Sequence, residues 1–228
     1  MHGLILVDKP LNWTSFDVVA KIRGVIKAKT GERVKVGHSG TLDPLATGLL
    51  VVAIGSYTKK LPDLIKQDKS YEAKMCLGKT SNTGDAEGEL TEISNVKPSK
   101  PQILHTIAKF VGDITQVPPR FSAKKINGRR AYDLARAGQQ FKIEPRAVRV
   151  QSIALKAYNY PILRLETVVS SGTYIRSLSE DIGNELGCGA YIQALRRTKI
   201  GKFKVDDAIQ LDNINYAKLS EHVLTLDK

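Results

Sequence analysis

Helical and strand-like patterns follow one another along this chain without a regular strand–helix–strand repeat. Residues 14–28 carry apolar side chains at helical spacing, at Val18, Val19, Ile22, Val25 and Ile26. Residues 70–78 alternate instead, with an apolar face made of Tyr71, Ala73, Met75 and Leu77. A regular βαβ repeat would predict a fully parallel sheet, whereas this irregular order predicts an α+β fold built on a mixed sheet.

The size of the chain permits one large domain or two small ones, since 228 residues are enough to bury a core. The longest apolar run, Leu49 to Ile54, is far shorter than the roughly 20 residues that a membrane-spanning helix needs. The apolar stretch near the N-terminus ends at Asp8 and predicts a buried strand, not a secretion signal. We therefore expect a soluble globular protein without a membrane partner.

Cysteine and histidine usage narrows the class of protein further. Cys76 and Cys188 lie far apart, which argues against a disulfide framework and fits a reducing cytoplasm. The four histidines are scattered and no pair has the spacing of metal ligands. We expect neither a metal nor a cofactor.

Positive charge is concentrated in one part of the sequence. The net charge is +12, and residues 120–149 hold nine Lys and Arg against Asp133 and Glu144, a balance of +7. An even distribution of +12 over 228 residues would give less than +2 there. A local excess of this size is what a phosphate-contacting surface requires. Both ends of the segment run into strand-like sequence, so we expect an insertion at about 118–150 that leaves a sheet and returns to it.

The segment "VGHSGTLDPLATG", residues 36–48, sets three glycines around a single acid, Asp43. Asp followed by Pro is typical of a helix start, with Asp as the N-cap and Pro44 at the first helical position. The alternative is a functional carboxylate exposed in a glycine-rich loop. These thirteen residues alone favour the capping interpretation.

A second candidate residue is Arg176, in the segment "SSGTYIRSL". If Thr173 caps a helix over residues 173–187, Arg176 falls in the first turn, where a cation opposes the helix dipole. A carboxylate could offset this cost, and Asp43 is one candidate; an aspartate paired in this way stays ionised. The alternative is a solvated arginine at a helix end.

Two tyrosines complete the set of candidates. Tyr71 and Tyr174 fit an ordinary core, but a protein that unstacks a base also needs an aromatic face. His38 is more typical of a hydrogen-bonded loop histidine than of a reactive one. The sequence has no Ser-His-Asp set at a familiar spacing, no phosphate-binding loop and no obvious pair of catalytic carboxylates. The residues indicate an RNA- or DNA-binding protein, with chemistry on a base as one option.

The motif "GHSGTLDPLATG" resembles the catalytic motif of the tRNA pseudouridine-55 synthases of the TruB type. Six collinear segments extend the resemblance over about two hundred residues: "VDKP", "KSYEAKMCLG", "GDAEG", "VPPRFSAKKINGRRAYDLARAG", "SGTYIRSL" and "LGCGAYIQALRRTKIG". The resemblance implies the pseudouridine synthase fold, a largely antiparallel mixed sheet flanked by helices, with a basic insertion that clamps RNA. It also implies a cytoplasmic isomerase that uses no cofactor and acts on the T-arm stem-loop of tRNA.

The resemblance assigns a role to each candidate. Asp43 matches the catalytic aspartate, and Arg176 the arginine that pairs with it. Tyr71 matches the tyrosine that packs on the uracil, Tyr174 its aromatic neighbour, and Leu195 an apolar wall of the pocket. His38 matches the histidine that fills the space left by a flipped base. We expect the insertion to contact RNA through Lys124, Lys125, Arg129, Arg130, Arg146 and Arg149.

The sequence also departs from the family pattern. Asn12 stands at a usual glycine, Asn82 at a usual aspartate and Phe121 at a more usual tyrosine. We expect a single catalytic domain over residues 1–228 without the C-terminal RNA-binding domain of many relatives, and see no obligate protein partner. The alternatives are a guide-RNA-dependent synthase, a non-catalytic RNA-binding or tRNA-folding protein, and a DNA-binding or base-removing enzyme.

Overall fold

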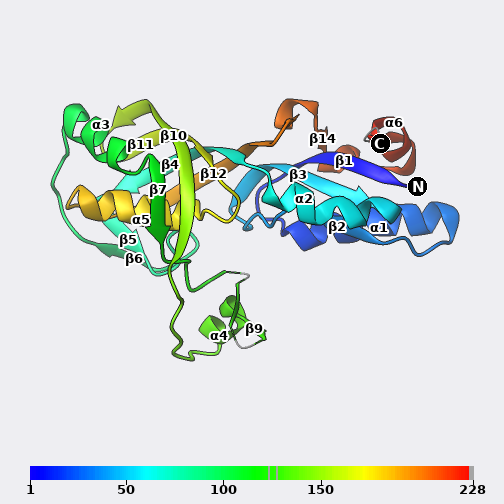
Figure 1. Cartoon of the computed structure of the whole chain (residues 1–228), viewed down its shortest axis with the longest axis horizontal. Helices are drawn as coiled ribbons and strands as arrows, with labels where there is room; N and C mark the ends of the chain where they lie inside the picture. Colours follow the sequence, from blue (N-terminus) through cyan, green and yellow to red (C-terminus); the bar gives the residue numbers. More distant parts are fainter. Residues whose placement is uncertain (123, 127, 226–228) are drawn as a thin grey trace. The chain divides into compact units, whose positions relative to one another are not determined.

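The computed structural model describes residues 1–122, 124–126 and 128–225 (Figure 1). The chain divides into two compact units, one made of residues 1–71 and 196–228 and the other of residues 72–195. Two strands, β4 (Lys69–Leu77) and β12 (Ala190–Ile200), contribute residues to both units. The expectation of one catalytic domain stays a prediction.

The first unit is built around strands in the order β14-β1-β3-β12, with β2 on β3 and β13 on β12. Strand β1 pairs antiparallel with β3 and parallel with β14, so the sheet is mixed, as predicted. Its elements are β1 (Gly3–Lys9), α1 (Ser15–Thr30), β2 (Val36–His38), β3 (Ala46–Ile54), η1 (Gly55–Lys60), α2 (Leu61–Lys66), β13 (Phe203–Lys204), η2 (Val205–Asp207), β14 (Ile209–Gln210), η3 (Leu211–Asn213) and α6 (Tyr216–His222).

Helix α1 forms where the apolar spacing predicted it. Thr14 is its N-cap: the Thr14 hydroxyl accepts from the backbone N–H of Asp17, and the Asp17 carboxylate accepts from that of Thr14. The apolar face of α1 packs on side chains from β1 and β3 in one buried cluster. The opposite faces of these strands are buried against residues of α2, β12, β13 and η2, in a second cluster. Because both faces are covered, β3 carries the uninterrupted apolar run seen in the sequence.

The second unit continues the strand order as β12-β4-β11-β10-β7. Strand β10 pairs antiparallel with both β11 and β7. Helix α3 packs on α5 and β10. The elements are β5 (Lys79–Ser81), β6 (Leu90–Glu92), α3 (Lys100–Lys109), β7 (Gly112–Gln116), β8 (Lys125–Ile126), β9 (Arg129–Arg130), α4 (Ala131–Arg136), β10 (Arg146–Asn159), β11 (Ile162–Val169) and α5 (Ile175–Glu185).

The basic segment leaves the second unit between two paired strands. Gln116 at the end of β7 lies opposite Arg146 at the start of β10. Residues 117–145 form an excursion between them, which carries β8, β9 and α4 and projects away from both strands (Figure 1).

Within residues 79–90, β5 pairs with β6 in a two-stranded ladder. One local expectation was wrong. Thr173 is not the N-cap of α5: the cap is Tyr174, and the Thr173 hydroxyl donates to the carbonyl of Ser170. The Gln116 side chain instead fixes the cap residue itself, because its Oε1 accepts from the Tyr174 N–H at 2.8 Å. Among the described residues no helix is long and apolar enough to cross a membrane.

Candidate functional site: the Asp43 loop and the Arg176 network

Asp43 lies in a turn between β2 and β3, and no helix follows it. The Ala46 N–H donates to the Asp43 carbonyl at 3.0 Å, and β3 begins at Ala46. The predicted role of Asp43 as a helix N-cap is therefore wrong, because the chain enters a buried strand within three residues. Asp43 is half-buried and takes part in at least one interaction with another group.

The start of the chain holds one end of this turn. Ser15 bonds the residue before Asp43 twice, donating to the Leu42 carbonyl at 3.2 Å and accepting from its N–H at 2.8 Å. Pro44, the residue after Asp43, accepts from the Asn12 N–H at 2.9 Å and from Lys9 Nζ at 3.3 Å. Lys9 is fully buried. Asn12 has φ 64°, which explains why asparagine can replace the usual glycine there.

Arg197 holds the other side of the loop. It is 1% exposed and donates three hydrogen bonds to backbone carbonyls: to Leu49 at 2.8 Å, to Gly40 at 3.0 Å and to Thr41 at 3.4 Å. The bonded carbonyls lie before and after Asp43, so one planar guanidinium fixes both arms of the loop. Gly48 is required beside it, because a Cβ there would lie 2.3 Å from the Arg197 carbonyl oxygen.

His38 and Tyr71 belong to the same unit as Asp43. The Gly40 N–H donates to His38 Nδ1 at 3.3 Å, which leaves Nε2 as the protonated nitrogen of a neutral ring. Burial, and then the charge of Arg197, lower the pKa of His38 and favour this neutral form. Tyr71 is buried on β4.

A buried lysine lies two residues before Tyr71 on the same strand. Lys69 Nζ donates to the carbonyls of Ile65 and Gln67. Burial, and then the charge of Arg197, lower the pKa of Lys69 to about 8. The Lys69 Cε would lie 4.0 Å from a Cβ placed on Gly40, so the start of β4 lies beside the Asp43 loop.

Arg176 forms a buried network in the second unit. Its Nη1 donates to the Thr83 carbonyl at 2.8 Å and its Nη2 to the Phe121 carbonyl at 2.7 Å. Asp85 lies 3.4 Å from Nη1, and both side chains are almost fully buried. These acceptors offset the unfavourable position of a cation in the first turn of α5. The alternative of a solvated Arg176 is therefore wrong, while its pairing with Asp43 stays a prediction.

The sequence did not single out Asp85, although it lies in the quoted motif "GDAEG". Its Oδ1 accepts from the Thr83 hydroxyl at 2.7 Å and from the Glu87 N–H at 3.1 Å. Glu180, one turn after Arg176 on α5, is a further acid of this network. Burial, and then the neighbouring Asp181, raise the pKa of Glu180 to about 7.

Tyr174 and Arg146 lie in contact, although Tyr174 was predicted to lie beside the uracil and Arg146 to contact RNA. The Arg146 guanidinium lies over the Tyr174 ring, 4.8 Å from its centroid. Gln116 holds the Tyr174 backbone at both its N–H and its carbonyl. Leu195 is half-buried on β12.

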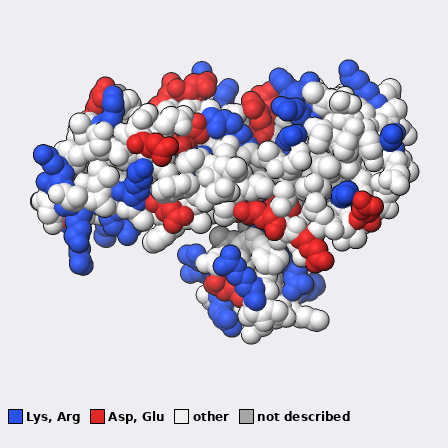
Figure 2. Space-filling model, turned by 180° about the vertical axis from the view of Figure 1, so that it is seen from behind, with Lys and Arg blue, Asp and Glu red and all other residues white. Residues whose placement is uncertain are grey.

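The Lys and Arg side chains of the excursion differ in how far they are exposed and bonded. Lys125, Arg129 and Arg130 are exposed, whereas Lys124 donates to the Glu144 carbonyl at 3.0 Å. Arg149 forms an exposed ion pair with Asp113 outside the excursion. Lys and Arg cover much of the lobe at the bottom of Figure 2, which is the excursion that contains α4 and β9 in Figure 1. Across the part of the chain that the structure describes, no cluster of His, Cys, Asp and Glu could hold a metal ion.

Two sequence profiles match the chain. Residues 24–175 match the "TruB family pseudouridylate synthase (N terminal domain)", and residues 176–227 match the "tRNA pseudouridylate synthase B C-terminal domain". A tRNA pseudouridine synthase B from Dechloromonas aromatica is 44% identical over 100% of this chain and 75% of its own length. The protein of that name from Clostridium acetobutylicum is 40% identical over 100% of this chain and 77% of its own length.

Solved structures agree on the fold. A chain in the crystal structure of a Cbf5-Nop10-Gar1 complex superposes with a TM-score of 0.73 at 30% identity, covering 96% of this chain and 55% of that one. A chain in an H/ACA RNP bound to a substrate RNA containing 2'-deoxyuridine gives a TM-score of 0.69 at 29% identity, over 96% and 55%. This chain thus spans about half the length of those two structural relatives.

The α+β fold with its mixed sheet, the fixed carboxylate loop and the named relatives define an isomerase of the pseudouridine synthase class. Within that class the chain belongs to the TruB family of pseudouridylate synthases. The resemblance seen in the sequence is thereby confirmed at the level of family and enzyme class.

Proposed function

We propose that this protein converts the uridine at position 55, in the T-arm of tRNA, to pseudouridine, with Asp43 as the catalytic carboxylate. The reaction breaks the bond between C1′ and N1 of the uracil and forms a bond between C1′ and C5. N1 gains a proton and C5 loses one, so the reaction needs no oxidant or second substrate. A tRNA substrate would place the protein in the cytoplasm.

The observation that carries this proposal is the way the Asp43 loop is held. Ser15 and Lys9 bond the residues on either side of Asp43, and Arg197 bonds the arms of the loop beyond them. A carboxylate whose neighbours are all fixed can act on a reacting atom without reorganising first. A protein that only binds RNA gains nothing from a fixed acid close to phosphates, because the two repel.

Other residues have roles that follow from their surroundings. Tyr71 offers a buried aromatic ring for the uracil, and Tyr174 and Leu195 have the roles of aromatic neighbour and apolar pocket wall that the resemblance gives them. His38, neutral and half-buried, suits the space left in the RNA by a flipped base because it adds no charge there. The excursion supplies the phosphate contacts of the T-arm.

The guide-RNA-dependent synthase is the second candidate, since by their titles one structural relative comes from a complex with two other proteins and the other from an RNP bound to a substrate RNA. The higher identity to proteins named tRNA pseudouridine synthase B, 44% against 30%, favours direct action on tRNA. Activity on a transcript without any guide RNA separates the two.

The test is incubation with an unmodified tRNA transcript followed by mapping of pseudouridine. We expect one modified position, in the T-loop. An Asp43→Asn variant should give no product in a single-turnover assay while binding tRNA about as tightly as the wild type, because loss of a negative charge does not weaken contact with RNA. Release of free uracil would indicate a base-removing enzyme, and turnover by Asp43→Asn would exclude the assignment of Asp43.

A further inference from the structure

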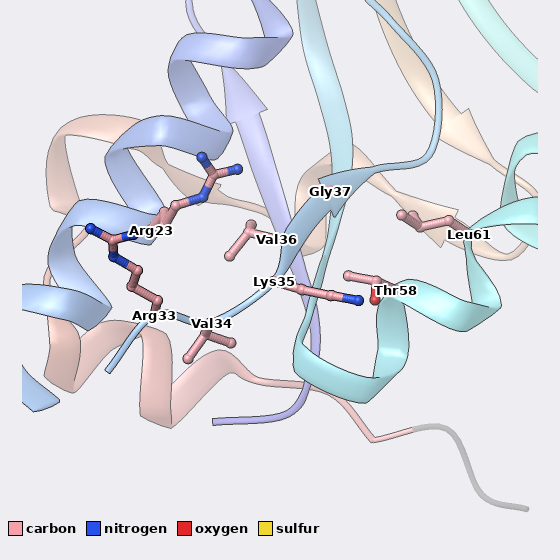
Figure 3. Close-up of a pocket in the computed structure, with 8 residues that line it drawn as sticks. All are labelled: Arg23, Arg33, Val34, Lys35, Val36, Gly37, Thr58 and Leu61. Carbon is pink, nitrogen blue, oxygen red and sulfur yellow. The ribbon is translucent and has the colours of Figure 1, made fainter. Parts of the chain in front are cut away.

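An open groove in the first unit lies outside the residues discussed so far (Figure 3). It has a volume of about 460 Å³, and three cations line it: Arg23 on α1, Arg33 on the segment after α1, and Lys35 just before β2. The remaining lining residues are Val34, Val36, Gly37, Thr58 and Leu61. None of the eight is acidic, and the nearest acid in the sequence, Glu32, does not line the groove.

The three cations are available to a ligand. All are exposed, and within the described part of the chain none of them forms an ion pair with an acidic side chain. In Figure 3 the guanidinium groups of Arg23 and Arg33 lie on the α1 side of the groove, and the Lys35 side chain extends toward Thr58 on η1. The groove thus holds three uncompensated positive charges on two opposite walls.

The floor of the groove is held in place by the core. Val34 and Val36 pack on the buried cluster beneath α1, so the backbone that carries Lys35 is fixed by the core. Leu61 packs closely on the backbone at Gly37, where a Cβ would lie 2.8 Å from Leu61 Cδ1. An apolar floor flanked by cations suits a sugar–phosphate backbone, whose ribose faces are less polar than its phosphates.

The groove leads directly to the Asp43 loop. Its floor, residues 34–37, continues as β2 into His38 and the loop that carries Asp43. Strand β2 is pinned to β3 by pairing of Gly37 with Ala53 and of His38 with Val52. His38 lies three positions after Lys35, a span of about 10 Å in extended chain.

We propose that the Arg23–Arg33–Lys35 groove binds phosphates of the substrate RNA, as a second phosphate-binding site distinct from the excursion at 117–145. This inference rests on the proposed RNA substrate, although not on the role of Asp43. The groove would hold the backbone of the strand that presents the reactive uridine, and so fix the approach of that strand to the loop.

The test measures tRNA affinity at several salt concentrations for an Arg23→Gln/Arg33→Gln variant. Each phosphate contact contributes about −0.7 to −0.9 to the log–log salt slope, so the double variant should flatten the slope by about 1.5. Between about 50 and 200 mM salt the wild type should therefore lose roughly eightfold more affinity than the variant. Glutamine retains part of the side-chain stem, and both positions are exposed, so the fold should be unchanged.

The matched control is Lys27→Gln/Lys29→Gln, which removes the same charge from exposed positions in the last turn of α1 that do not line the groove. An unchanged slope in the groove variant, or an equal change in the control, overturns the proposal. Pseudouridine formation at saturating enzyme is measured in parallel. Normal product with an unchanged slope rejects the groove alone, whereas a flattened slope without product from the wild type rejects the proposed reaction alone.

Discussion

At the scale of single residues, Arg176 makes several contacts at once that a lysine side chain could not make together. Its two Nη atoms reach different carbonyls, those of Thr83 and Phe121, while Nη1 also faces Asp85. We expect Arg176→Lys to lower the single-turnover rate by about 100-fold or more, the typical cost of losing one fixed electrostatic contact, with tRNA affinity unchanged. The control is Arg164→Lys, at an exposed position on β11.

Removal of the Arg176 charge tests the same network by its effect on the stability of the folded protein. Arg176→Met leaves Asp85 buried without its cation, and breaking a buried pair in this way costs about 3–5 kcal/mol. The unfolding temperature should therefore fall by several degrees or more, in contrast to Arg164→Met. An Arg176→Lys variant with wild-type turnover, or an Arg176→Met variant with wild-type stability, would contradict this view of Arg176.

At the scale of elements, Arg197 connects β12 to the loop between β2 and β3. Arg197→Lys retains the charge but cannot reach the carbonyls of Gly40, Thr41 and Leu49 together, and each buried acceptor left without a donor costs about 1–3 kcal/mol. We expect a lower unfolding temperature and a slower single-turnover rate, because both arms of the Asp43 loop loosen. The control variant is Val19→Ala, which creates a cavity under α1 away from the loop. If Val19→Ala loses as much stability and as much activity as Arg197→Lys, the effect of the Arg197 substitution is not specific to the loop.

The exposed cations of the excursion should contribute to the salt dependence of tRNA binding. Replacement of the exposed Lys125, Arg129 and Arg130 by Gln should flatten the salt dependence of tRNA binding by about 2 to 2.7 units in log–log slope, if each contacts one phosphate. The control replaces three lysines that are already ion-paired with glutamates in the same unit: Lys79, Lys109 and Lys156. Equal slopes in the two variants would show that the excursion faces away from the RNA.

The elements also show where sequence patterns succeed. The cap at Thr14 was predictable, because its partner Asp17 is three residues away and within the same turn. The start of α5 at Tyr174 was not, because the side-chain oxygen that accepts from the Tyr174 N–H belongs to Gln116, 58 residues earlier. The prediction of Asp43 as a helix N-cap was wrong for a similar reason. The Asp-Pro pattern is local, but the strand that follows is held by a sheet made of distant segments.

At the scale of the whole molecule, the residues that support the site are those that no local pattern identifies. Arg197 lies 157 residues from Gly40 in the sequence, and Arg176 lies 93 residues from Thr83. Local patterns did single out Asp43, as a lone acid in a glycine-rich loop, and Arg176, as a cation in the first turn of a helix, and the resemblance of motifs then assigned each a role. It gave no reason to single out Asp85, Arg197 or the Arg23–Arg33–Lys35 groove, whose roles depend on contacts formed only in the folded chain.

Two ionisable groups, the buried Lys69 in one unit and the half-buried Glu180 in the other, predict how the stability of the whole molecule changes with pH. The pKa of Glu180 is raised to about 7, so the folded state binds the proton more tightly than the unfolded chain, and stability falls as pH rises from about 4.5 to 7. The pKa of Lys69 is lowered to about 8, so the unfolded chain binds the proton more tightly, and stability rises between about pH 8 and 10.5.

The measurement is chemical unfolding at a series of pH values for the wild type, Glu180→Gln and Lys69→Met. Glu180→Gln should lose the decline between pH 4.5 and 7, and Lys69→Met the rise above pH 8. Because β4 and β12 each contribute residues to both units, we expect one cooperative transition to carry both effects. Two transitions, with Glu180→Gln moving one and Lys69→Met the other, would mean that the units unfold separately. A wild-type profile that neither variant alters would contradict the assigned pKa shifts themselves.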